Sequence, residues 1–74
     1  MFIGGTEYRV VYEPGLRGRI GCAGYHRPDE YLCLDPTATR EDFIHEVIEA
    51  VNYQRELGLS HDQITVLGEE LSCL

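Results

Sequence analysis

The chain has 74 residues, enough for one domain with a thin core, because folding at this size buries only about 60% of the unfolded chain's surface. Its 43% hydrophobic and 26% charged residues are typical of a globular domain rather than a disordered chain. Thirteen acidic residues, six arginines and no lysine give a net charge of −7. No basic stripe forms, so the sequence predicts no nucleic-acid partner and no anionic membrane partner.

The sequence also bears on compartment and on thiol chemistry. No apolar run approaches the roughly 20 residues of a membrane span, and the N-terminus lacks the pattern of a signal peptide, so we expect a cytoplasmic protein. Cys22, Cys33 and Cys73 are odd in number and contain no Cys-x-x-Cys pair, which predicts reduced, mostly buried thiols. Without repeats or linkers, residues 1–74 are expected to form a single domain.

The first half of the chain carries strand signals. Thr6 to Glu13 alternates Tyr8, Val10 and Tyr12 with more polar neighbours, which predicts a strand. A Pro-Gly turn and a glycine-rich loop follow, and residues 19–25 predict a second, weaker strand. Residues 26–29 are expected to turn, and residues 30–34 to form a third strand that Asp35-Pro36 ends.

The second half carries helix signals. Thr39 with Asp42 resembles a capping box, and apolar residues recur at helical spacing from there to Leu57, before a stop at Gly58. Ser60 with Gln63 is a fuller capping box for a second helix, whose leucines are expected in the core. The sequence therefore predicts an α+β domain of order β-β-β-α-α: a small, three-stranded, mostly antiparallel sheet followed by a helical hairpin.

The first predicted helix contains the one chemically suggestive motif, His45-Glu46-Val47-Ile48-Glu49. Residues four, seven and eleven apart share a helix face, so His45 and Glu49 lie together on a polar stripe. Zinc peptidases use this spacing for two ligands, with the glutamate after the first ligand acting on a water molecule. We therefore expect His45 and Glu49 to bind zinc or another divalent metal, with Glu46 as the catalytic base.

Glu49 stands where the peptidase signature has a second histidine. A carboxylate also ligates zinc, but its charge weakens the metal's Lewis acidity, and an oxygen-richer site makes Mn²⁺ or Fe²⁺ more credible. A third ligand is expected from the second helix. If the helices pack antiparallel, Glu69 lies level with Glu49, whereas His61 is the better ligand type but lies level with Glu56. A crossed helix pair would favour His61, so both stay candidates.

The run "DEYLCLDPTATREDFIHEVIEAVNYQRELGL" resembles the strand-then-helix core of minimal zincin-like metallopeptidase domains found in phage and bacterial genomes. The matching residues are Leu34-Asp35-Pro36, at the strand end, and His45 to Ala50, at the motif, and the likeness spans about Gly21 to Leu71. The resemblance implies metal ligation by His45 and Glu49, with Glu46 in the position of the base.

Two functional hypotheses follow from this reading. The first is a minimal metal-dependent hydrolase acting on peptide bonds. The second is a non-catalytic module that keeps a zincin-like fold in order to bind a protein or peptide partner. The sequence predicts no particular substrate, partner or oligomeric state.

Overall fold

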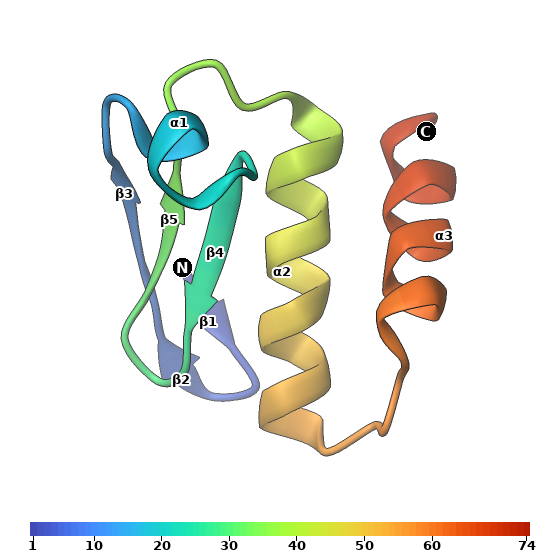
Figure 1. Ribbon diagram of the computed structural model, residues 1–74. Coiled ribbons are helices and arrows are strands. Elements are labelled where there is room, and N and C mark those ends of the chain that lie inside the picture. The colour runs from blue at the N-terminus through green and yellow to red at the C-terminus, as the bar shows by residue number, and fades with distance from the viewer.

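The computed structural model describes all 74 residues. Its elements form three layers, a sheet, a long helix and a shorter helix, with the long helix α2 in the middle (Figure 1). In chain order they are β1 (Phe2–Ile3), β2 (Thr6–Glu7), β3 (Arg9–Tyr12), α1 (Leu16–Ile20), β4 (Gly24–Arg27), β5 (Tyr31–Leu34), α2 (Arg40–Arg55) and α3 (His61–Ser72). The predicted α+β class is confirmed, and no helix is long and apolar enough to cross a membrane.

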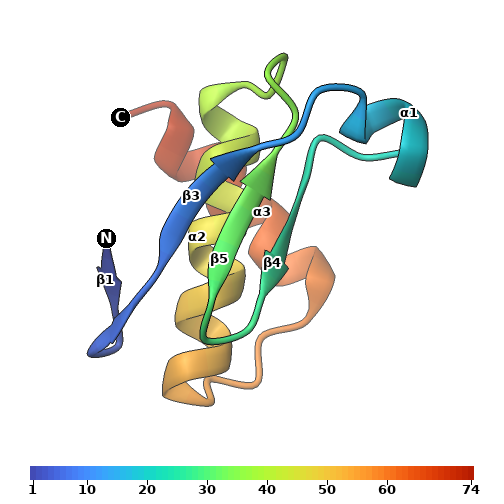
Figure 2. The same cartoon turned by 90° about the vertical axis from the view of Figure 1, so that its left-hand side faces the viewer.

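The main sheet has the strand order β3-β5-β4 (Figure 2). β5 pairs in parallel with β3, through Val10 and Leu32, and antiparallel with β4, through His26 and Leu32. The prediction of a mostly antiparallel sheet is therefore wrong for one of its two pairings. β5, the last of these three strands in the chain, lies between β3 and β4, so β4 forms an edge of the sheet.

The chain start forms a separate hairpin of β1 and β2. Its turn needs glycine at position 4, which has a φ of +57° and where a Cβ would lie 2.6 Å from the Cβ of Gln54 on α2. The predicted single strand over residues 6–13 is in fact two, β2 and β3, separated at Tyr8. The buried Tyr8 joins Ile3, Leu32 and Ala50 in the core.

A short helix, α1, occupies part of the region predicted as a weak strand. It buries Leu16 completely, and left-handed glycines flank it at positions 15 and 21. The Asp35 carboxylate at the end of β5 accepts the backbone N–H of Arg17 at 2.9 Å, and also the N–H and hydroxyl of Thr37. This hydrogen bond between residues distant in sequence anchors α1 at the end of the sheet, next to the end of β5 (Figure 1).

Both predicted capping boxes are present, Thr39 with Asp42 on α2 and Ser60 with Gln63 on α3. The core expected of α3 is only partly there: Ile64 is buried, whereas Leu67, Leu71 and Leu74 are exposed, because α3 lies on α2 rather than on the sheet (Figure 1). Of the cysteines, all free, only Cys33 is buried, which corrects the prediction of mostly buried thiols.

Candidate metal centre

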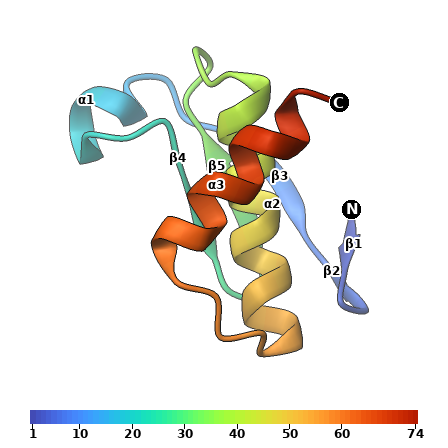
Figure 3. The same cartoon turned by 90° about the vertical axis from the view of Figure 1, so that its right-hand side faces the viewer.

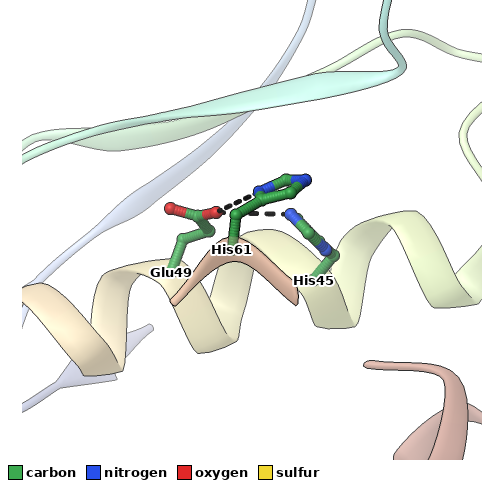
Figure 4. A group of neighbouring side chains, drawn as sticks. All are labelled: His45, Glu49 and His61. Carbon is green, nitrogen blue, oxygen red and sulfur yellow. Dashed lines mark ion pairs between the residues drawn. The ribbon is translucent and has the colours of Figure 1, made fainter. Parts of the chain in front are cut away.

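Three side chains converge between α2 and α3. His45 and Glu49 are one turn apart on α2, and His61 is the first residue of α3 (Figure 4). Glu49 Oε1 lies 3.3 Å from His45 Nε2 and 3.8 Å from His61 Nδ1, and the two imidazole centroids are 5.3 Å apart. One donor atom from each residue fits within 4.8 Å of the others.

The loop between the helices determines where His61 lies. Asn52 on α2 accepts the backbone N–H of Leu59 at 2.9 Å and donates its side-chain amide to the Leu59 carbonyl at 3.4 Å. The Ser60 capping box begins α3 immediately after this clamp. The first residue of α3 is thereby held beside Glu49.

Glu69, the rival candidate for the third ligand, is exposed and lies outside this cluster. The expected alignment of the two helices is wrong, because a Cβ placed on Gly68 would lie 3.7 Å from the Cα of His45, not beside Glu49. α3 also runs obliquely across α2 (Figure 3). That crossing brings His61 to Glu49 and leaves Glu69 outside the cluster.

The spacing of the three donors fits a divalent cation. Zinc binds imidazole nitrogen and carboxylate oxygen at about 2.1 Å, so tetrahedral ligands lie roughly 3.4 Å apart. The two separations from Glu49 Oε1, 3.3 and 3.8 Å, are close to this value, and all three donor atoms lie within 4.8 Å of one another. Two imidazoles and one carboxylate are also a donor set of hydrolytic zinc sites, in which a fourth position stays open. Structural zinc sites use four protein ligands instead.

Glu46 lies next to this cluster, buried with 8% of its surface exposed. Its carboxyl accepts no hydrogen bond from the protein, and burial, followed by repulsion from Glu49 and Asp42, raises its pKa to about 7. Gly24 on β4 makes room for it, since a Cβ there would lie 3.3 Å from Glu46 Cγ and 2.8 Å from the Cys33 carbonyl oxygen. A carboxyl with a pKa near neutrality suits proton transfer.

The cluster and Glu46 open into one cleft of about 530 Å³. Its walls come from β4 and the residues before it, from α2 and from the first turns of α3. The lining residues are Cys22, Ala23, Gly24, Tyr25, His26, Asp42, His45, Glu46, Glu49, His61 and Thr65.

One lining residue, His26, lies where the sequence predicts a turn. It lies on β4, and its Nε2 is 3.1 Å from the hydroxyl of the buried Tyr8. Desolvation lowers the pKa of His26. No apolar–polar alternation in the sequence marks β4, and the turn lies two residues later, at Pro28-Asp29, where the Glu30 N–H bonds to the Arg27 carbonyl.

No protein-family model matches the chain, and no curated protein or solved structure matches it significantly. The function is therefore inferred from the geometry of the cleft.

Proposed function

We propose that this protein is a minimal metal-dependent hydrolase of peptide bonds, in which His45, Glu49 and His61 bind a divalent cation and Glu46 is the general base. One observation carries the proposal: three ligand-type side chains converge at an open cleft beside a buried carboxyl with a pKa of about 7. His61 supplies the second imidazole that the helix motif lacks, so the donor set regains the composition of zinc hydrolases.

The protein residues divide the chemistry between them. A cation bound at the three ligands would acidify a water molecule and polarise a carbonyl group. Glu46 would take a proton from the water while the water oxygen attacks the carbonyl carbon. It would return that proton to the amine when the C–N bond breaks. The products are a carboxylic acid and an amine, and Glu46 ends in its starting protonation state.

The edge strand β4 supports a peptide as the substrate. The Ala23 carbonyl accepts the Asp35 N–H, so in the antiparallel alternation Tyr25 and Arg27 also pair with β5. The backbone groups of Gly24 and His26 therefore face away from β5, next to the cleft. An extended peptide can add to such an edge by main-chain hydrogen bonds, and its carbonyl groups would then run past the cluster.

A zinc titration followed by NMR and calorimetry tests the metal site without any substrate. We expect signals of His45, Glu49 and His61 to shift, and each of His45→Ala, Glu49→Ala and His61→Ala to weaken zinc affinity at least about tenfold, because even outer-shell changes have effects of that size. Glu69→Ala is the matched control and should bind zinc like the wild type. Equal affinities for all four variants, or a wild type that binds no zinc, would refute the proposal.

A second function is favoured by the outer face of α3. Leu59, Val66 and Leu67 contribute to an apolar groove of about 420 Å³ that Asp62 and Gln63 border. α3 also carries Glu69 and Glu70 and has no lysine or arginine. Charge complementarity points to one occupant, a helix of another protein with an apolar face and basic flanks.

A synthetic amphipathic helix with lysine flanks tests this second function. We expect it to shift the NMR signals of Val66 and Leu67 whether or not zinc is present, and Val66→Asp to abolish the shifts. Thr65→Asp, at the neighbouring position facing the cleft, is the control. An unchanged spectrum at millimolar peptide would exclude this mode of binding.

A further inference from the structure

The hydroxyl of the buried Tyr8 lies at the centre of a hydrogen-bond network that reaches the surface at Asp29. It accepts the backbone N–H of Asp29 at 2.9 Å and the side-chain amide of Gln54 at 2.9 Å. The orientation of that amide follows from chemistry, because its nitrogen also donates to the Asp29 carboxylate, which is an acceptor only. The Gln54 oxygen in turn accepts the Thr6 hydroxyl at 3.1 Å.

This network determines how Tyr8 meets His26. Two donors, from Asp29 and Gln54, occupy both lone pairs of the Tyr8 oxygen, so its single proton remains for His26 Nε2, 3.1 Å away. Nε2 is therefore an acceptor and carries no hydrogen. The neutral ring must then hold its proton on Nδ1.

The Nδ1–H group of His26 has no partner in the protein, and the His26 ring lines the same cleft as His45, Glu49 and His61. Protonating Nε2 as well would set its N–H against an oxygen with no free lone pair. The lowered pKa of His26 agrees with a ring that stays neutral. His26 therefore offers a fixed, uncharged donor on a ring that belongs to the β4 wall of the cleft.

We propose that His26 Nδ1–H and the cation at His45, Glu49 and His61 together form an oxyanion-binding subsite, which takes a carboxylate or the developing oxyanion of a carbonyl. The cation in this subsite rests on the function proposed above. A neutral donor suits this role because it binds negative charge without adding to the charge of the site, and it is held in place before the ligand arrives. The subsite therefore selects a ligand with a negatively charged oxygen. One oxygen of the ligand would bind the cation, and the same oxygen or a second one would accept the His26 Nδ1–H.

The first arm of the test needs neither metal nor substrate. Long-range ¹H–¹⁵N spectra of the metal-free protein should show His26 with its hydrogen on Nδ1. Tyr8→Phe removes the hydroxyl and should release the ring to a mixture of tautomers, while the tautomer of His45 stays unchanged. A hydrogen on Nε2 in the wild type overturns the proposal.

The second arm uses acetate as the probe on the zinc-loaded protein. We expect acetate to shift the His26 ring signals, and His26→Ala to weaken its affinity about tenfold while zinc affinity is unchanged. His26→Asn keeps an N–H near the position of Nδ1 and should recover most of the affinity. His26→Gln places its amide near Nε2 and should not.

The outcomes separate this inference from the proposed function. If zinc binds but all His26 variants bind acetate equally, the subsite is overturned and the metal site stands. If the wild type binds no zinc, the proposed function and the cation half of the subsite both fail. The tautomer measurement then still decides whether His26 is a fixed donor.

Discussion

The two buried charged side chains of this molecule, Asp35 and Glu46, are held in opposite ways. Asp35 receives three hydrogen bonds, from Arg17 and Thr37, and these lower its pKa to about 2. Glu46 receives none from the protein, and burial raises its pKa to about 7. The two carboxyls therefore have pKa values shifted in opposite directions, because only Asp35 has hydrogen-bond partners for its charge.

The largest expected difference between the two carboxyls is in catalysis. Glu46→Gln should lower zinc-dependent peptide hydrolysis about 10²- to 10⁴-fold, because it removes the general base, while zinc affinity stays the same. Asp35→Asn should leave the activity of each folded molecule unchanged. Mass spectrometry of a digested peptide mixture measures both. A fully active Glu46→Gln variant would contradict the role of the base.

The next effect is on thermal stability. In Asp35→Asn an NH₂ group replaces one carboxylate oxygen, so a donor N–H group of the protein faces another donor and loses its acceptor. We therefore expect Tm at pH 7 to fall by roughly 5 °C or more. Stability from Asp35 is present above its ordinary pKa of 3.8 and is lost as the pH falls toward 2, so the variant should also lose less stability over that window. Glu70→Gln makes the same charge change at an exposed site, and it should alter neither Tm at pH 7 nor the loss of stability at low pH.

The pH dependence of Glu46 has the opposite sign. Its folded pKa of about 7 lies above its ordinary value of 4.5, so its contribution is fully present below pH 4.5 and is lost as the pH rises through 7. With chelator at pH 8, Glu46→Gln should therefore raise the free energy of unfolding by about 2 kcal/mol, a figure reduced from the full shift because the cleft admits water. Urea unfolding at pH 4.5 and 8 measures it. Equal effects at the two pH values would contradict the origin we assign.

The smallest effect separates the donors to Asp35. Thr37→Val removes the hydroxyl that lies 2.7 Å from Oδ1 but keeps both backbone donors. The pKa of Asp35 should rise and Tm should fall by about 2 °C, less than in Asp35→Asn. NMR titration of the carboxyl gives the pKa. An unchanged value would assign the shift to the backbone donors alone.

Local signals predicted the parts of the fold that local chemistry determines. Both capping boxes and the helices that they begin follow from side chains bonding to backbone three residues away. The pairing of His45 with Glu49 likewise needs only helical geometry. Such features can be derived without knowing how the elements pack.

The missed features depend on contacts between distant residues. α1 forms where a glycine-rich loop and the start of a strand were predicted, because Leu16 is buried and Asp35, at the end of β5, accepts the Arg17 N–H. The parallel pairing of β3 with β5 reflects the insertion of β5 between two earlier strands, which no local pattern encodes. His61, and not Glu69, lies beside Glu49 because Gly68 packs against His45 and because Asn52 holds the loop at Leu59.

Binding of the proposed cation would also affect the stability of α3, because of where this helix lies. α3 buries only Ile64 and Gly68, so it has little to hold it and should open locally more readily than the sheet. A ligand in its first turn ties that helix to α2 when metal is bound, and binding energy then becomes resistance to local opening. Amide hydrogen exchange in α3 should slow on adding zinc, while exchange in the N-terminal hairpin stays constant. The metal would thus act as a removable cross-link that decides whether the C-terminal helix is in place.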